Sequence, residues 1–210
     1  MNTSRVLLTS LLAGMCGLAS AQAALTLAKR GQKPEYVIMH AEGAAPSIIL
    51  GCQEFQQFVC EQTGVTLPLV TDAAALPAKV VLVGDTRYTR ELLGANYNLE
   101  ALRDDGFQLR TVGERLVVLG GKRGAMYGLF ELLERFGGCR WYASWCSVIP
   151  TRDDFVIPSL AETQQPAFLM REPFWYDMFN TTMAYRNKCN GNRMNLSEEQ
   201  GGKIRFGGGL

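Results

Sequence analysis

The sequence is poor in several residues and charges that particular functions require. His40 is the single histidine among 210 residues, which leaves almost no material for a histidine-rich metal site or a histidine-based catalytic triad. The 21 basic and 20 acidic residues give a formal charge of +1, so the chain has no general attraction for nucleic acid or anionic lipid. With 47% hydrophobic residues, the composition is that of a globular protein, and we expect no nucleic-acid partner.

Long apolar runs are also missing, apart from one short stretch near the N-terminus. Arg5 precedes an apolar stretch over residues 6–18, and Ala21-Gln22-Ala23 fits the small-x-small pattern of a cleavage site. A membrane-spanning helix needs about 20 apolar residues, so this stretch is too short, and no other segment is longer. The pattern favours a signal peptide over residues 1–23 and export to the periplasm or the extracellular space. A buried N-terminal helix is the alternative.

The cysteines do not form a closed disulfide framework. Of the six, Cys16 lies in the expected leader, and the odd number that remains cannot all pair with one another. Cys52 and Cys60 lie eight residues apart in a predicted helix, about 12 Å along its axis, which is too far for a bond. Cys139 and Cys146 could pair if the aromatic loop between them folds back. The sequence favours buried free thiols, and without a Cys-x-x-Cys pair it predicts no zinc site.

Hydrophobic periodicity predicts an α/β domain. Apolar runs and one alternating hairpin predict strands over residues 36–39, 65–70, 79–83, 106–111 and 115–119. Apolar stripes of helical period predict helices over residues 46–63 and 124–136, with Gly64 and Gly137 at their ends and a short helix before Leu93. We expect a mixed β-sheet layer with the helices packed on one side.

The character of the chain changes after residue 150. Residues 151–165 are polar and proline-rich, which predicts a linker with one short strand over residues 155–157. Residues 166–210 are apolar again but contain nothing that completes a second fold. We therefore expect a signal peptide (1–23), an α/β domain (24–150), a linker (151–165) and the start of a truncated domain (166–210).

A glycine-rich loop over residues 120–124 precedes the second long helix. Such a loop can bind phosphate, but Arg123 stands where a phosphate-binding loop has Ser or Thr, and Leu116 stands where it has its first glycine. A tight strand-to-helix connection that uses glycine for positive φ is the favoured interpretation.

Aromatic residues and carboxylates supply the candidate binding residues. Trp141, Tyr142 and Trp145, with Trp175 and Tyr176 later in the chain, can form a sugar-stacking surface or a buried domain interface. The paired carboxylates, Asp104-Asp105 among them, stand beside turn residues and are expected to be solvated. Glu172 and Asp177 lie in an apolar setting where a carboxylate needs a partner, and Arg171 is the nearest candidate.

Three strings resemble a known family. They are DGFQLR (residues 105–110), RLVVLGGKRGAMYGLFELLE (115–134) and GCRWY (138–142). Together they resemble the N-terminal domain of α-glucuronidases of glycoside hydrolase family 67, above all in exported proteins where this domain precedes an uncharacterised barrel-like domain. The same fold occurs as the second domain of family 20 β-hexosaminidases. The resemblance covers roughly residues 30–165.

The resemblance implies an α/β layer that packs on a (β/α)8 barrel and carries no catalytic residue. We also expect no metal or cofactor on this chain. Residues 166–171 are similar to the first barrel strand, where an arginine of family 20 contacts sugar hydroxyls. The resemblance points to Arg171 as a sugar-binding residue, although Glu172 stands where that family has glycine. With Glu172 and Asp177 from their apolar setting and Trp141 from the aromatic cluster, it completes the candidate substrate-binding residues. The acid and base carboxylates of the family lie on later barrel strands.

The sequence thus predicts the N-terminal accessory domain of an exported carbohydrate-active protein, with a carbohydrate substrate and hydrolysis by the missing barrel. A non-catalytic glycan-binding or interaction module is the first alternative, and a scaffold domain that only stabilises its neighbour is the second. For the chain itself we expect residues 30–165 to be ordered. Residues 178–210, which lack sheet neighbours, are expected to be mobile or to dock on the first domain.

Overall fold

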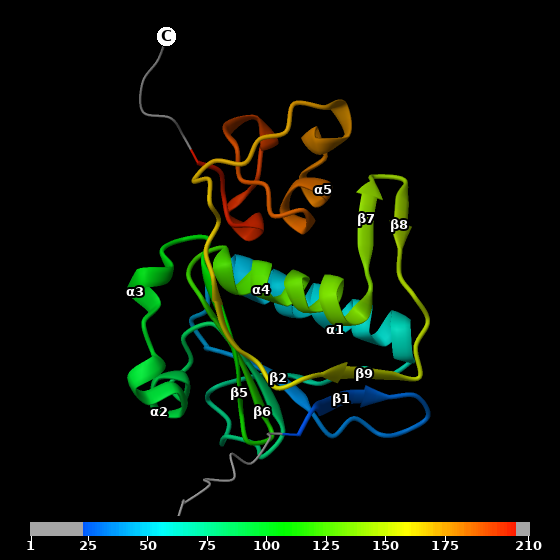
Figure 1. The fold of residues 1–210 in the computed structure, drawn as a ribbon, viewed down its shortest axis with the longest axis vertical. Helices are drawn as coiled ribbons and strands as arrows, with labels where there is room; N and C mark the ends of the chain where they lie inside the picture. The colour runs from blue at the N-terminus through cyan, green and yellow to red at the C-terminus, as the bar shows by residue number, and fades with distance from the viewer. Residues whose placement is uncertain (1–22, 205–210) are drawn as a thin grey trace, which may run out of the picture.

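The computed structural model describes residues 23–204 of the chain (Figure 1). The expected signal peptide lies outside these residues except for Ala23. The described part consists of a central sheet with helices on both faces, two small two-stranded sheets, and a C-terminal segment that packs on the long helices.

The central sheet is mixed, as predicted. Its six strands run in the order β10-β5-β6-β4-β2-β3. Strands β3, β2, β4 and β6 are parallel, whereas β5 is antiparallel to both β6 and β10. The bounds are β2 Val37–His40, β3 Leu69–Thr71, β4 Val80–Val83, β5 Phe107–Val112, β6 Arg115–Gly120 and β10 Ala161–Gln164. The predicted hairpin is β5–β6. The strand expected over residues 65–70 is shorter and begins at Leu69.

Two long helices cover one face of this sheet (Figure 1). Helix α1 (Pro46–Thr63) ends at Gly64, whose φ of 75° is the left-handed cap that the sequence predicted. Helix α4 (Gly124–Leu132) continues into a π-helical turn, Leu133–Gly137. Their apolar stripes form the main core with the sheet, in which Phe55 and Phe130 are almost wholly buried.

The opposite face is covered as well, which corrects the expectation of helices on one side only. Helices α2 (Thr89–Leu93) and α3 (Leu99–Leu102) place Leu93 and Leu102 in a second core with side chains of the central strands. The physical reason lies in β4, whose four residues are all buried. Parallel strands that are apolar on both faces need cover on both faces.

Residues 151–165, expected to be a linker with one short strand over 155–157, contain that strand and a second one. Strand β9 (Asp154–Ile157) pairs with β1 (Leu25–Lys29), and β10 adds an edge strand to the central sheet. The aromatic loop forms a hairpin from β7 (Arg140–Ala143) and β8 (Cys146–Val148). The chain therefore stays in contact with the α/β layer well beyond residue 150.

The glycine-rich loop is a tight connection for a reason other than the predicted one. Gly120, Gly121 and Gly124 are not among the described glycines with positive φ. Instead, a Cβ at Gly121 would overlap the carbonyl oxygen of Arg103, and one at Gly124 would overlap that of Gly106. Close backbone approach, rather than backbone conformation, requires glycine here.

Residues 166–204 contain no strand among their described residues, so the strand expected over 166–171 is absent and the start of a barrel is not confirmed. The segment forms helix α5 (Thr181–Arg186) and the 3-10 turns Tyr176–Phe179, Asn192–Met194 and Glu198–Gln200. It docks on the first domain, because Met183, Tyr185 and Met194 are buried in the main core. With no neighbouring strand, backbone groups of this segment find side-chain partners instead: Arg171 N donates to Asn190 Oδ1.

Candidate functional site

A buried polar junction joins the α/β layer to the C-terminal segment. Arg123, from the glycine-rich loop, donates from Nε to Asp105 Oδ1 and from Nη1 to the carbonyl of Gly201 over 3.1 Å. Asn190 Nδ2 donates to Asp105 Oδ2 over 2.9 Å, and Arg171 Nη2 lies 3.6 Å from the same oxygen. The side chains of Arg123 and Asp105 are 4% and 7% exposed. Asp105 is thus the centre of this junction.

The burial of Asp105 corrects the expectation that the Asp104-Asp105 pair is solvated. Asp104 is 68% exposed, whereas Asp105 faces inward between two guanidinium groups. Burial alone would lower the pKa of Arg123, but the hydrogen bond and charge of Asp105 outweigh it, and the pKa is raised. Burial, together with the charge of Asp105, raises the pKa of Tyr127. The junction therefore favours a charged Arg123 and a neutral Tyr127.

Arg171 reaches into the junction and also lines the cleft above it. Its Nε donates to the carbonyl of Lys188 over 2.7 Å, and its Nη1 donates to that of Phe168 over 3.0 Å. Its guanidinium carbon lies 5.6 Å from the centre of the Tyr127 ring. Its Nη2 is buried and makes no hydrogen bond. The partner of Arg171 is Asp105, so the expectation that it pairs with Glu172 or Asp177 is wrong.

Glu172 and Asp177 have separate partners. Glu172 Oε2 accepts from the backbone N of Arg193 over 2.9 Å, and Arg193 Nε lies 3.8 Å from Glu172 Oε1. Asp177 accepts from both the backbone N and the Oγ of Ser144, at the tip of the β7–β8 hairpin. The structure therefore does not bring Arg171, Glu172 and Asp177 together in one site.

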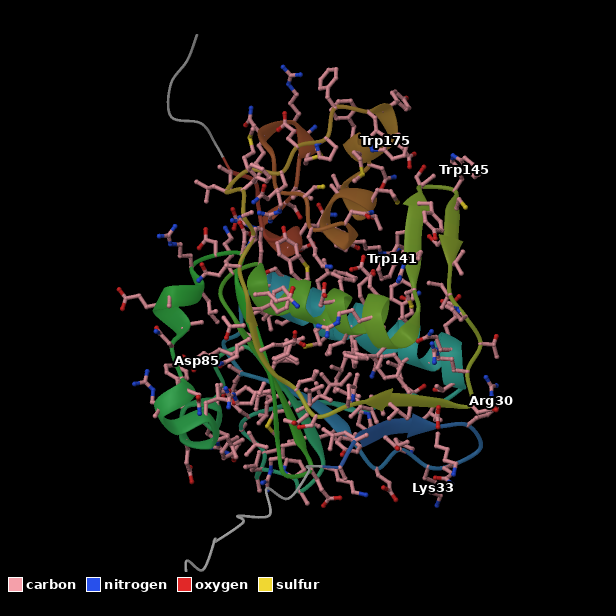
Figure 2. All side chains as sticks on the ribbon, viewed as in Figure 1. Arg30, Lys33, Asp85, Trp141, Trp145 and Trp175 are labelled. Carbon is pink, nitrogen blue, oxygen red and sulfur yellow. The ribbon has the colours of Figure 1, made fainter. Side chains whose placement is uncertain are left out.

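Trp141 is a core residue. It is 4% exposed, and its ring packs edge-on against Phe58 and Phe130 at centroid distances of 5.3 and 5.5 Å. For Trp141 the buried interpretation holds, because no ring face is open to a sugar. Trp145, on the same hairpin, is 85% exposed. Figure 2 shows Trp141 beside the long helices and Trp145 at the far end of the hairpin.

A cleft of about 540 Å³ lies over the junction. Phe168 and Leu169 line it from the C-terminal segment, and Arg103 lines it from the α/β layer. The lining carboxylates are Asp104 and Asp105, and Asp105 is already engaged by Arg123, Arg171 and Asn190. Glycoside hydrolysis needs two carboxyl groups about 5–10 Å apart across the bond. The lining of this cleft offers no two unengaged carboxylates.

The described residues were also compared with the requirements of a metal site, a reactive thiol and a membrane-spanning helix. In residues 23–204, no group of three His, Cys, Asp or Glu side chains is placed to hold a metal ion. The five cysteines of this part are free, and burial raises the pKa of Cys139 to about 12, which keeps it a thiol. Among the described helices, none combines the length and the apolar character needed to span a bilayer.

Sequence reasoning missed Asp105, Arg123 and Asn190 as members of one site. A signal was present, because Asp105 and Arg123 both lie in the strings that carry the family resemblance. What the sequence does not show is that these strings meet in space, where the loop before β5 contacts the loop before α4.

Comparisons with known proteins place the chain in a family. The family model described as "Glycosyl hydrolase family 67 N-terminus" matches residues 23–132. No curated protein matches the chain. Among solved structures, the chain is similar to a family GH115 4-O-methyl-α-glucuronidase with specificity for decorated arabinogalactans, with 20% identity and a TM-score of 0.50. The match covers 71% of this chain and 19% of that one.

Two further solved structures match with lower scores. They are a mutant β-hexosaminidase from Streptomyces plicatus in complex with GlcNAc and the GH20 β-N-acetylhexosaminidase from Streptomyces coelicolor A3(2). Each has 12% identity and a TM-score of 0.44, and each match covers 71% of this chain and 25% of the other. The chain thus spans a quarter or less of these proteins. Because the family model covers more than half of its residues, the chain belongs to the family of glycosyl hydrolase family 67 N-terminal domains.

Proposed function

We propose that this chain is the N-terminal accessory domain of an exported glycoside hydrolase and is itself not catalytic. Family membership carries the proposal, and the chemistry of the cleft supports it. The one buried carboxylate there, Asp105, is neutralised by arginines and cannot act as an acid or a base without losing those partners. Hydrolysis belongs to two carboxylates of a following barrel domain, on which this domain packs.

In this proposal the residues expected to bind substrate have structural roles. Arg171 ties the C-terminal segment to Asp105, Glu172 orders the turn at Arg193, and Asp177 fixes the hairpin. A carbohydrate substrate is bound by the barrel of the complete protein. No cofactor or metal takes part on this domain.

The test compares two proteins: the 210-residue chain and the product of the reading frame extended beyond codon 210. Both are assayed on a panel of aryl glycosides and glucuronosides, at equal molar concentration. We expect turnover by the longer product and none by the 210-residue chain. Hydrolysis by the 210-residue chain, or a stop codon directly after Leu210, would remove the accessory role.

Export is proposed from the leader pattern and has its own test. The longer product is expressed with its native N-terminus in a host that secretes, and the mature N-terminus is sequenced. We expect it to begin at Ala24. A mature protein that retains Met1 would contradict export by this leader.

Exposed aromatic residues favour one second candidate, a glycan-binding module. Trp145 is 85% exposed and Tyr176 is 91% exposed, so both offer a ring face to solvent. Calorimetry of the 210-residue chain with an oligosaccharide panel tests this function, with Trp145→Ala as the variant. Heat of binding that Trp145→Ala abolishes would favour the module. The absence of heat with every glycan would exclude it.

A further inference from the structure

The C-terminal segment, residues 166–204, is attached to the α/β layer by ion pairs of one polarity. Within the described residues, every ion pair between these two parts except one has its carboxylate on the layer and its cation on the segment. The exception, Lys122 with Glu198, lies at the surface, since the Glu198 side chain is 78% exposed. We call the layer's members of these pairs the four carboxylates; they are Glu54, Asp105, Glu131 and Glu134.

Three of the four carboxylates are on the long helices and the turn that follows. Arg186 donates from Nε and Nη2 to Glu54 of α1, over 2.8 and 3.0 Å. Lys188 Nζ lies 2.8 Å from Glu131 Oε2 of α4 and also pairs with Glu134 in the π-helical turn. These side chains are only 12–24% exposed. Water therefore screens their charges far less than it screens a pair at the surface.

Other polar groups also lie close to the four carboxylates. Those of the layer are Arg135 and Gln164 at Glu131, Arg140 at the carbonyl of Glu134, and Arg123 and Tyr127 at Asp105. Those of the segment are Tyr185 at Glu54, and Asn190 with Arg171 at Asp105. The layer's own arginines stay beside the carboxylates whether or not the segment is docked. The cations that depend on docking for a partner are therefore Arg171, Arg186 and Lys188.

The backbone at Lys188 adds an independent sign that the docked form is held by contacts. Its φ of 58° lies in the left-handed region, which a lysine seldom adopts. Such a conformation persists where surrounding contacts impose it. Here the carbonyl of Lys188 accepts from Arg171 Nε over 2.7 Å, and its Nζ is bound by two glutamates. Loss of these ion pairs lets the backbone leave the left-handed region.

Acid changes only one member of each pair. Carboxylates lose their charge near about pH 4, whereas arginine and lysine keep theirs. In the docked segment, Arg186 and Lys188 would then be largely buried without a counter-ion, which is unfavourable, whereas water solvates them in a released segment. The released form therefore binds protons more tightly than the docked form does, and by linkage acid favours release.

We propose that acid releases the C-terminal segment from the α/β layer: the four carboxylates take up protons together, and the segment undocks while the sheet and the long helices stay folded. Burial of Met183, Tyr185 and Met194 opposes release, so the loss of several ion pairs is needed at once. The inference goes beyond the proposed function and does not depend on it.

The α/β layer keeps packing of its own when the segment leaves. Figure 1 shows the segment at one end of the molecule, outside the sheet and the long helices. The core between the sheet and helices α2 and α3 contains no residue of the segment. On the other face, Phe55 of α1 packs edge-on against Phe155 of β9 at a centroid distance of 5.7 Å. These contacts are independent of the four carboxylates.

The test is hydrogen exchange of the 210-residue chain between pH 7 and pH 3.5, read by mass spectrometry as protection factors, which remove the pH dependence of intrinsic exchange. Uptake of at least two protons makes release about a hundredfold more favourable per pH unit. Protection of residues 178–204 is therefore expected to fall about a hundredfold or more between pH 4.5 and pH 3.5, while that of β4 and β6 changes less than about threefold. A fall of tenfold or less in residues 178–204, or an equal loss in β4 and β6, would overturn the proposal.

The carboxylates are identified with Glu54→Gln and Glu131→Gln, and Glu91→Gln, exposed on α2 across the sheet, is the matched control. Each of the first two removes one proton-binding group, so release is expected to begin at a higher pH and to be about tenfold less steep per pH unit. Glu91→Gln is expected to match the parent. Circular dichroism at pH 7 checks folding, and Glu134→Gln replaces a variant that fails this check. Release with the parent's midpoint and steepness in the folded carboxylate variants would refute control by these groups.

Discussion

Replacing Asp105 by Asn tests the central claim about the polar junction. The change keeps the size of the side chain but removes the negative charge. Arg123 pairs with two carboxylates, and Asp105 is the buried one, whereas Asp104 is 68% exposed. Arg171 loses its counter-ion at the same time, since its Nη2 lies 3.6 Å from Asp105. Two guanidinium groups would then remain in an environment that disfavours unpaired charge.

The expected cost follows from that burial. Removing one partner of a buried ion pair destabilises a protein by about 3–5 kcal/mol, because the other charge stays uncompensated. Stabilities of natural domains lie at about 5–15 kcal/mol, so Asp105→Asn removes a large share of the total. For a chain of this size, each kcal/mol shifts Tm by about 2–4 °C, and we expect a loss of about 10 °C.

The neighbouring residue provides the matched control. Asp104 is 68% exposed and lies 3.4 Å from Arg123 Nη2, so Asp104→Asn is expected to cost less than about 1 kcal/mol. The assay is urea unfolding at pH 7, followed by far-ultraviolet circular dichroism, for the 210-residue chain and both variants. If the two variants unfold at the same urea concentration, Asp105 is not the buried centre of the junction.

Three further predictions concern other parts of the structure. Burial would raise the pKa of Glu131, but the hydrogen bond and charge of Lys188 outweigh this effect and hold the pKa below the ordinary 4.5. The contribution of Glu131 to stability is therefore present above pH 4.5 and is lost as the pH falls. The difference in unfolding free energy between Glu131→Gln and the parent is expected to be smaller at pH 3.5 than at pH 7, and a larger difference at pH 3.5 would refute this prediction. Gly121→Ala is expected to lower Tm markedly, because its Cβ would overlap backbone, whereas Gly43→Ala, with nothing within 4 Å, is neutral; equal Tm values would contradict the close approach. Trp141→Ala is expected to cost about 3–5 kcal/mol in urea unfolding, since the ring is buried; a cost below about 1 kcal/mol would place that ring at the surface.

The elements that the sequence predicts well are those whose signal is local. The helix over residues 46–63 has an apolar stripe, a proline at its start and a glycine at its end, and all three features are present in α1. In the β5–β6 hairpin, β5 alternates apolar and polar residues, and a tight turn at Gly113 leads into the apolar run of β6. Strand β3 was placed too early because Val65 and Leu67 are buried without being in a strand. A short apolar run in a sequence is the same whether its residues are buried in a loop or in a strand.

The polar junction could not be predicted, because its residues come together only in the folded chain. A carboxylate beside a turn is solvated unless a cation covers it, and the cations that cover Asp105 come from far along the chain, at Arg123 and Arg171. No residue near Asp105 in the sequence indicates that Arg123 and Arg171 will pair with it. Likewise, Trp141 and Trp145 look alike in sequence, and only the position of α1 and α4 makes one of them core and the other surface. The fold class was predictable, whereas the partners of the charged residues were not.

The pairing of β1 with β9 has a consequence for how the protein folds during synthesis. Leu25 pairs with Ile157, so the first strand of the described chain waits for its partner until more than a hundred further residues have been made. At roughly 10 residues per second, this delay exceeds about ten seconds. During that time the apolar side chains of β1 stay uncovered by β9, and the edge that β10 later occupies stays open. The β1–β9 and β5–β10 pairings therefore form only after almost the whole domain has left the ribosome, and until then these strands are accessible to chaperones.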